Sequence, residues 1–291
     1  MRSAPARLPA DDPRFPTSLL AISDCPSALW YCGAVDAFEP PAVAIVGSRA
    51  ASAVGLEMAT RLSADLARVG IVIVSGLARG VDSAAHRAAL RDGRTIAVLG
   101  SACDVIYPAE HAPLARDIAE HGLVISEYPP GTPPHQGQFP MRNRIISGLS
   151  RAVVVIEAHE KSGSLITARL ALQQGRDVMA VPGNPLTGRN RGGHALIRDG
   201  AKIVESADDI LEELGLVLQS SDTEAQLLSS CSARSSGDAL LAAMDAGEAY
   251  DLDALGARSG LDGGKLLPRL LDLELRGLIR RAGAGRFMRL A

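Results

Sequence analysis

The chain has 291 residues, 47% of them hydrophobic and 22% charged, and these ordinary globular values exclude a disordered or fibrous protein. Its length suits one large α/β domain with a smaller module. The formal net charge of −3 excludes a protein that coats nucleic acid through bulk electrostatics, so any DNA site has to be local.

The predicted elements of the first part of the chain alternate between strands and helices. A strap over residues 1–41 comes first and packs Trp30 and Tyr31. Apolar runs predict strands at 42–46, 71–75, 95–99, 123–126, 152–158 and 177–181. Helical patterns lie between them at 52–69, 108–121, 142–149 and 164–174. Continuous apolar strands separated by helices predict a mostly parallel sheet with helices on both faces, within residues 42–216.

The C-terminal part of the chain predicts a linker and a second domain. Residues 217–236 contain seven serines and no periodicity, which is typical of a flexible linker. Residues 237–291 predict three helices followed by a small hairpin, the pattern of a winged helix-turn-helix domain. The three helices are expected at 237–245, 251–258 and 262–275.

Compartment and metal content follow from simple patterns. No window approaches the roughly 18 uncharged apolar residues of a membrane span. The first residues carry prolines and acids where a signal peptide has an apolar run. The four cysteines are scattered without a C-x-x-C pair, which favours reduced thiols over disulfides or zinc. We therefore expect a cytoplasmic protein that binds neither membrane nor metal.

Two predicted loops have the composition of phosphate sites. Ligands of parallel sheets bind at the carboxyl ends of the strands, and the first strand is followed by Gly47, Ser48 and Arg49. Backbone N–H groups at a helix N-terminus and a guanidinium favour an anion there. Tight turns and helix N-caps are the structural alternative. The spacing is not G-x-G-x-x-G, so no dinucleotide cofactor is expected. The same combination recurs before the helix predicted at 164–174, at Lys161, Ser162, Gly163 and Ser164.

The loop after the second strand carries Arg79, Asp82 and His86. Its glycines allow close backbone approach to a ligand, and Arg79 is a candidate DNA contact. Asp82 suits the N-cap of the next helix, and His86 lies one helical turn later. We expect these two side chains to pair with each other, because no nucleophile is spaced to join them in catalysis.

A proline-rich loop over residues 129–144 presents an aromatic ring beside basic residues. Phe139 is followed by Arg142, Asn143 and Arg144. The prolines hold such a loop open at low entropic cost, and an aromatic face beside guanidinium groups suits an unstacked base with its phosphate. The alternative is a buried Phe139 with solvated arginines at a helix start.

Together these residues carry a family resemblance. Five motifs occur in the order VAIVGSRAAS, SGLARGVDSAAH, FPMRNRIISGLS, KSGSLITA and VPGN, and over residues 42–204 the chain resembles the DprA/Smf family. The resemblance implies an extended Rossmann-like domain that binds single-stranded DNA, forms homodimers and hands the strand to the RecA recombinase in natural transformation. The C-terminal part is similar to the winged-helix domain that often ends these proteins.

The resemblance also implies roles for individual residues. It places phosphate contact on Ser48 and Arg49 and base and backbone contact on Phe139 and Arg144, with further contact from the loop at 161–164. Some family members carry a basic residue three positions before the phenylalanine, where this chain has Gln136. We therefore expect one strand contact to be weaker here.

Two other function classes compete with this interpretation. Related folds include nucleotide-processing hydrolases, but alignment of their motif on Thr167 places Leu170 where the catalytic glutamate belongs, and leucine cannot transfer protons. A winged-helix transcription regulator is the second alternative. The presumed recognition helix, 262–275, offers two basic against three acidic residues, Lys265 and Arg269 against Asp262, Asp272 and Glu274, which argues against duplex reading. We expect no enzyme, no catalytic residue and no cofactor.

Overall fold

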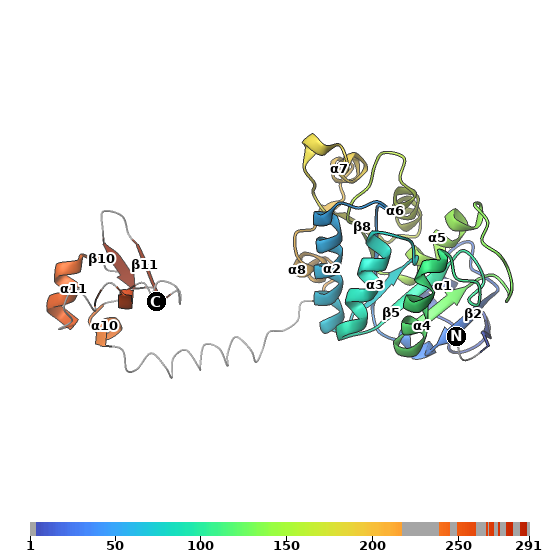
Figure 1. The fold of residues 1–291 in the computed structure, drawn as a ribbon, viewed down its shortest axis with the longest axis horizontal. Helices are drawn as coiled ribbons and strands as arrows, with labels where there is room; N and C mark the ends of the chain where they lie inside the picture. Colours follow the sequence, from blue (N-terminus) through green and yellow to red (C-terminus); the bar gives the residue numbers. More distant parts are fainter. Residues whose placement is uncertain are drawn as a thin grey trace. The chain divides into compact units, whose positions relative to one another are not determined.

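A computed structural model describes residues 4–216, 239–244, 249–259, 266, 268–270, 273, 278–281 and 286–289. The chain forms two compact units, Met1–Val217 and Leu218–Ala291, and Figure 1 shows the elements of each. The predicted linker at 217–236 lies outside the described residues. Of the helix predicted at 262–275, only residues 266, 268–270 and 273 are described, and all five are helical.

Within residues 4–216, nine strands form one sheet in the order β1-β2-β6-β5-β4-β3-β7-β8-β9. The strands from β6 to β9 along this order pair in parallel, whereas β1 pairs with β2 and β2 pairs with β6 in antiparallel. The strands are β1 (Ala6–Pro9), β2 (Ala28–Gly33), β3 (Ala42–Val46), β4 (Val72–Ser75), β5 (Thr95–Leu99), β6 (Leu123–Ser126), β7 (Ala152–Val155), β8 (Asp177–Ala180) and β9 (Lys202–Ile203).

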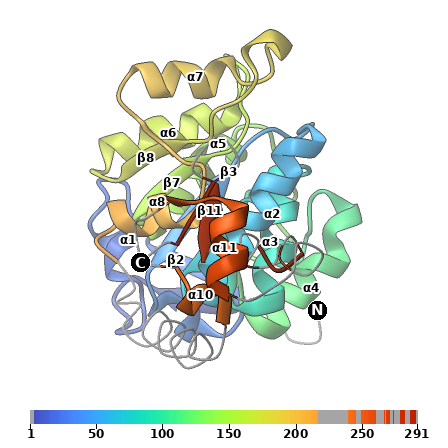
Figure 2. The same ribbon diagram turned by 90° about the vertical axis from the view of Figure 1, so that its left-hand side faces the viewer.

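Helices cover both faces of this sheet, as Figure 2 shows. The helices of this unit are α1 (Thr17–Leu20), α2 (Ala53–Arg68), α3 (Val81–Asp92), α4 (Ala112–His121), α5 (Gln138–Leu149), α6 (Gly163–Gln173), α7 (Arg191–Arg198) and α8 (Ala207–Glu213). Short 3₁₀ turns occupy Val35–Phe38, Ala109–His111 and Pro185–Thr187. None of the helices in the described part of the chain is long and apolar enough to cross a membrane.

The two faces of the sheet have separate apolar cores. Val43 and Ile45 of β3 pack with α2, α3 and α8, whereas Ala44 and Val46 pack with α1, α5 and α6. All four side chains are at most 4% exposed. Burial on both faces explains why β3 is continuously apolar, because successive side chains of a strand point to opposite sides. The predicted mostly parallel sheet with helices on both faces is confirmed.

Two elements differ from the sequence-based expectation. The N-terminal segment contributes β1 and β2, so its apolar residues extend the sheet beyond the parallel strands. Helix α5 begins at Gln138, four residues before the predicted start, and therefore contains Phe139 and Pro140 in its first turn. Proline is tolerated there because the first amide groups of a helix have no intrahelical acceptor.

The described residues of the smaller unit form helices and a three-stranded antiparallel sheet of order β10-β12-β11. Leu240, Leu255 and Phe287 belong to its own apolar core. The elements are α10 (Ala239–Ala242), β10 (Ala249–Tyr250), α11 (Leu252–Ser259), β11 (Ile279–Arg281) and β12 (Phe287–Arg289).

Candidate nucleic-acid interface

The carboxyl ends of β3 and β4 bring two of the predicted loops into contact. Gly80, with a φ of 74°, lies against the backbone of Ser48 and Arg49, and a Cβ atom at this position would clash with the Ser48 carbonyl. The Val81 amide donates to that same carbonyl at 3.2 Å. Glycine is required at Gly80 both for the left-handed backbone and for this close approach. The result is that Arg49 and Arg79 are exposed on adjacent loops of one sheet edge.

The N-terminus of α2 already holds an anion. The carboxylate of Glu157, which follows β7, accepts a hydrogen bond of 2.6 Å from the Ser52 hydroxyl and lies 3.3 Å from the Ser52 amide nitrogen. Ser52 is also the N-cap of the helix, since its hydroxyl accepts from the Gly55 amide. A phosphate held by the first turn of this helix, as the sequence pattern suggested, would meet an occupied position. The loop at 47–49 stays free of this carboxylate.

Phe139 lies partly exposed at this edge, between two other side chains. Its ring centroid is 5.5 Å from that of Tyr107, with the planes tilted by 40°. The guanidinium carbon of Arg49 lies 5.7 Å from the Phe139 centroid. A Cβ atom on Gly100, just after β5, would lie 2.8 Å from the ring, so glycine makes the seat that the ring occupies. Phe139 is therefore not a core residue, and its partly exposed ring is held by neighbouring residues.

Arg79 is exposed but already paired. Its guanidinium donates two hydrogen bonds to the carboxylate of Glu110, at 2.7 and 2.9 Å. This fork raises the pKa of Arg79 and lowers the pKa of Glu110. A phosphate at Arg79 would have to compete with Glu110, since the two-pronged geometry is the one that either oxyanion prefers.

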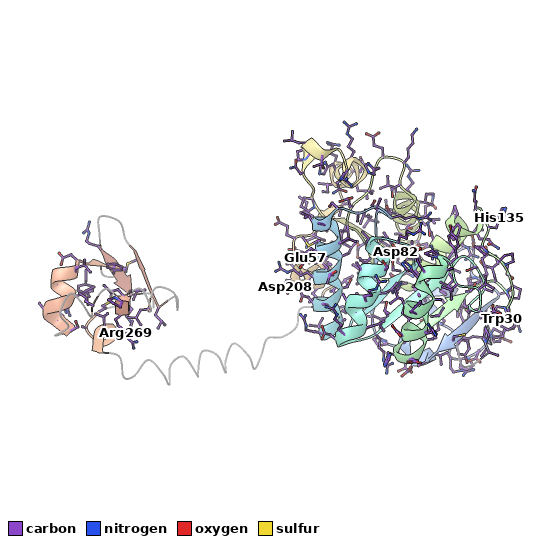
Figure 3. All side chains as sticks on the ribbon, in the orientation of Figure 1. Trp30, Glu57, Asp82, His135, Asp208 and Arg269 are labelled. Carbon is purple, nitrogen blue, oxygen red and sulfur yellow. The ribbon has the colours of Figure 1, made fainter. Side chains whose placement is uncertain are left out.

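Arg142 is buried, with 5% of its surface exposed. Its guanidinium donates to the carbonyl oxygens of Gly76, at 2.8 Å, and of Val98. The carboxylate of Asp82 accepts from the amides of Gly76 and Ala78, at 3.1 and 3.3 Å. Burial lowers the pKa of Arg142 to about 10 and raises the pKa of Asp82, and the opposite charge of each side chain opposes the shift of the other. Asp82, labelled in Figure 3, is also buried.

Arg144 is also buried, and it joins three segments. It donates to Asp24 at 2.9 Å and to Glu127 at 2.6 Å. Asp24 precedes β2 and Glu127 follows β6, so this arginine fixes α5 to the N-terminal segment and to the sheet. Neighbouring Asn143 donates to the Gly163 carbonyl at 3.5 Å and connects α5 with the start of α6. All three predicted side chains of α5 after Phe139 therefore have protein partners.

The loop at 161–164 leads into α6 with an exposed lysine. Lys161 is exposed, and Ser162 is the N-cap, accepting from the Ser164 amide at 3.3 Å. The two hydroxyl groups also hydrogen-bond to each other, at 2.7 Å. Helix α6 thus begins at Gly163, one residue before the predicted start at 164. Arg189, which follows β8, reaches the same edge and donates to the Ala50 carbonyl at 3.4 Å.

The expected pairing of Asp82 with His86 is wrong. His86 is fully buried and bonds through Nδ1 to the Thr95 hydroxyl at 2.7 Å. Because that hydroxyl donates to the Ile73 carbonyl, it accepts from His86, which places the histidine proton on Nδ1 and leaves Nε2 without a partner among the described residues. Burial lowers the pKa of His86 to about 3, with smaller contributions from Arg142 and His111.

Sequence reasoning missed the acids that organise this edge. Glu127 directly follows the predicted strand at 123–126, and this position was the available signal, because ligand-side loops begin there. Glu157 lay inside the predicted strand at 152–158, whereas β7 ends at Val155. Within the described residues, no group of three or more histidine, cysteine, aspartate or glutamate side chains could hold a metal ion.

Comparison with known proteins identifies relatives. The family profile described as "DNA recombination-mediator protein A" matches residues 7–215. The profile for the DprA winged helix domain matches residues 228–285, which confirms the predicted winged-helix domain. The DNA processing protein DprA of Streptococcus pneumoniae is 48% identical over 203 residues, 69% of this chain and 72% of that protein. Protein Smf of Escherichia coli is 42% identical over 284 residues, 96% and 76% of the respective chains.

Solved structures agree with this assignment. The X-ray structure of the Streptococcus pneumoniae protein superposes with a TM-score of 0.70 at 46% identity, covering 72% of this chain and 75% of that one. The DNA processing protein A of Helicobacter pylori, whose structure is described through its single-stranded DNA binding mode, gives a TM-score of 0.67 at 30% identity. It covers 73% of this chain and 96% of that one. The chain belongs to the DprA/Smf family of DNA-processing proteins.

Proposed function

We propose that this protein binds single-stranded DNA at the carboxyl edge of its large sheet and hands the strand to a RecA recombinase during natural transformation. The pair of Arg49 and Phe139 carries the proposal. The partly exposed ring and the guanidinium above it both offer stacking surfaces to an unpaired base. The guanidinium also offers a charge-assisted hydrogen bond to the adjoining phosphate. The strand-binding relative from Helicobacter pylori supports the same ligand here.

The proposed contacts divide into two groups. The exposed side chains of Arg49, Lys161 and Arg189 touch the strand, whereas Arg79 lies beside it and keeps its ion pair with Glu110. The backbone of Gly47 and Ser48 and the start of α6, at Ser162, Gly163 and Ser164, line the path between them. The buried Arg142, Asn143 and Arg144 act through position, because each donates to protein oxygens that hold α5 and its Phe139 in place.

The proposed role is binding rather than catalysis. Leu170 of α6 stands where a nucleotide hydrolase of related fold would need a carboxylate, and the buried Asp82 has its hydrogen bonds directed to backbone amides. We expect the protein to act in the cytoplasm, where a strand and its recombinase meet.

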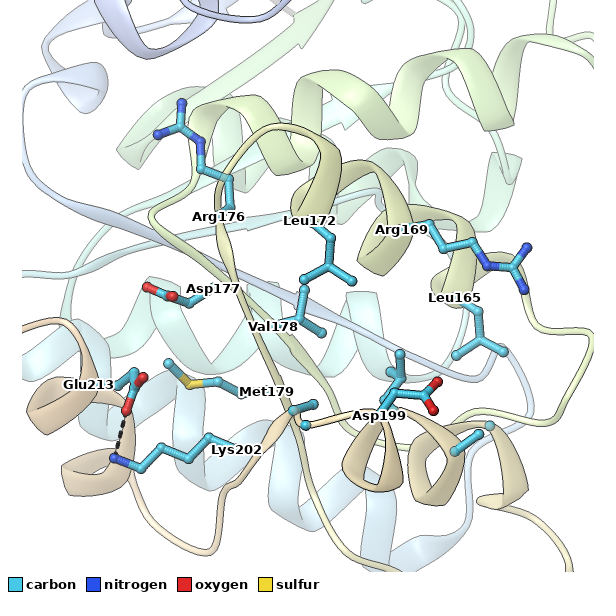
Figure 4. Close-up of a pocket in the computed structure, with 15 residues that line it drawn as sticks. Leu165, Arg169, Leu172, Arg176, Asp177, Val178, Met179, Asp199, Lys202 and Glu213 are labelled. Atoms are coloured by element: carbon cyan, nitrogen blue, oxygen red, sulfur yellow. Dashed lines mark ion pairs between the residues drawn. The ribbon is translucent and has the colours of Figure 1, made fainter.

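We further propose that the protein forms homodimers through the sheet edge at β9. This short strand ends the sheet, and the apolar side chains of Leu172 and Ile203 are 60% and 46% exposed near it. A cavity of about 360 Å³ lies between α6, β8 and α7, bordered by the ion pair of Lys202 with Glu213 at 2.9 Å (Figure 4). An open strand edge with exposed apolar side chains is a surface that a second copy can cover.

The test of the proposed ligand is a titration with single-stranded DNA, duplex of the same length and free nucleotides, with wild type and Arg49→Ala. We expect preference for the single strand, and a loss of about 1–3 kcal/mol of binding free energy in the variant. Arg151→Ala is the matched control, because it removes another exposed arginine, at the opposite end of β7. We expect it to bind as wild type does.

Two outcomes would contradict the proposal. Equal affinity for duplex and single strand would favour a duplex-reading regulator. An Arg49→Ala variant that melts normally and binds the strand as tightly as wild type would remove Arg49 from the site. Addition of RecA to strand-bound protein tests the second step. If the strand is handed over, RecA should load on it faster than on a strand that is coated with a single-strand-binding protein alone.

A further inference from the structure

The topological switch point of the large sheet lies between β3 and β7. Strands β4, β5 and β6 extend the sheet on one side of β3, and β8 and β9 extend it beyond β7. Ligands of doubly wound sheets enter the crevice at such a point, and their phosphates bind the N-terminus of the helix that follows the first strand. That helix is α2 here, and its 16 residues give it a full dipole.

The crevice contains a carboxylate of the protein itself. Glu157 is 6% exposed, and its carboxylate meets both the hydroxyl and the amide of Ser52, the N-cap of α2. Gly55, in the first turn, leaves the necessary room: a Cβ atom there would lie 3.0 Å from the Oε2 atom of Glu157. The carboxylate therefore occupies the place and uses the donors that a phosphate would use.

The surroundings would otherwise attract anions. Arg49, Lys161 and Arg189 are exposed on three loops around this crevice, and Arg189 donates to the carbonyl of Ala50, two residues before Ser52. In the described part of the chain none of the three forms an ion pair with Glu157. A helix N-terminus ringed by cations is the arrangement that binds free phosphate in other proteins, so its occupation by Glu157 has a consequence for selectivity.

We propose that Glu157 is an intramolecular anion that closes this crevice to free phosphate and nucleotides and so reserves the edge for a polynucleotide. The carboxylate is tethered and loses no translational freedom on binding, whereas a free phosphate has to displace it and meets its negative charge. A strand that contacts the rim loops does not have to displace it. The exclusion of free phosphate rests on the contacts of Glu157 alone, whereas the benefit to a polynucleotide rests on the proposed function.

The test measures binding of inorganic phosphate by the full-length protein in the absence of DNA, by calorimetry and by the shift of the melting temperature relative to chloride at equal ionic strength. We expect Glu157→Ala to bind phosphate at least about tenfold more tightly than wild type, the effect of regaining charge-assisted hydrogen bonds. Glu157→Gln keeps the space filled and the bond to Ser52, and we expect it to gain little.

The matched control is Glu160→Ala, which removes the same charge from the same loop, where Glu160 is exposed beside Arg191. Equal gains in Glu160→Ala and Glu157→Ala would assign the effect to net charge and overturn the proposal, as would a folded Glu157→Ala without any gain. If Glu157→Ala folds poorly, phosphate added during refolding should raise the yield of folded protein above the yield in chloride at equal ionic strength. Refolding that is indifferent to phosphate would also overturn the proposal.

Discussion

Replacement of Arg142 by methionine tests whether this side chain is structural or touches DNA. The sequence places Arg142 among DNA-binding residues, but in the structure its guanidinium is inside the protein and donates to two backbone carbonyls. Methionine retains much of the volume and removes the charge. If Arg142 is a positioning residue, the variant loses stability first, and strand affinity falls only as α5 shifts.

The expected cost follows from what the variant leaves behind. The carboxylate of Asp82 would stay buried with its two amide donors and would lose the nearby charge of Arg142, which opposes the rise of its pKa. No ion pair joins the two side chains, so this loss is smaller than the roughly 3–5 kcal/mol that a broken buried pair costs. The carbonyls of Gly76 and Val98 would also lose a donor, at about 1 kcal/mol each. Relaxation of the site offsets part of this sum, so we expect about 2–4 kcal/mol in total. Asp82→Asn combined with Arg142→Met removes both charges and should cost less than the two single changes together.

Urea unfolding followed by tryptophan fluorescence gives the measurement. Trp30 is the single tryptophan of the chain and lies in β2, so its signal reports the large unit alone. Arg151→Met is the control and should stay within about 0.5 kcal/mol of wild type, as exposed substitutions do. An Arg142→Met variant with wild-type stability and lost strand binding would refute the positioning role and restore Arg142 as a direct contact.

Two further predictions concern Phe139 and His86. Phe139→Ala should lose about 1–3 kcal/mol of strand binding while Phe139→Tyr nearly keeps it, because stacking needs only an aromatic face; a collapse of the melting temperature in the alanine variant would show that the ring supports the fold instead. His86 is neutral in the folded protein, with a pKa of about 3, and regains a pKa of about 6.5 on unfolding, so the unfolded state binds more protons below pH 6.5. As the pH is lowered from about 6 to about 4, the unfolding free energy should therefore fall by about 1.4 kcal/mol per pH unit. His86→Gln should flatten this dependence in urea titrations. The control is His135→Gln, which changes an exposed histidine (Figure 3) and should leave the dependence as it is in wild type.

Local patterns predicted the parallel sheet because each buried strand is continuously apolar. Short runs such as those of β3 and β7 cannot face water on either side, and the helices between them force parallel pairing. The same reasoning placed the ligand loops at the carboxyl edge. It could not detect β1 and β2, whose pairing is set by contact with β6 and not by a pattern of their own.

Partners distant in sequence limited the prediction of the site. Arg144 pairs with Asp24, 120 residues away, and Glu127, 17 residues away, and nothing in the run FPMRNR distinguishes this buried arginine from an exposed one. The prolines around Phe139 indicated a loop, but a proline in the first turn is compatible with a helix. Residue types were therefore informative about the ligand, whereas burial had to come from the fold.

The salt dependence of binding distinguishes the two descriptions of the site. At the carboxyl edge of the sheet, Arg49, Lys161 and Arg189 are the exposed cations without a carboxylate partner among residues 4–216. Three phosphate contacts with a single strand give a slope of log affinity against log salt of about −2. If Arg79, Arg142 and Arg144 also touched phosphate, six contacts would give a slope of about −4. Titrations at four salt concentrations measure this slope. A value near −4 would mean that the ion pairs of Arg79 and Arg144 open when the strand binds, and a slope near zero would contradict phosphate-led binding altogether.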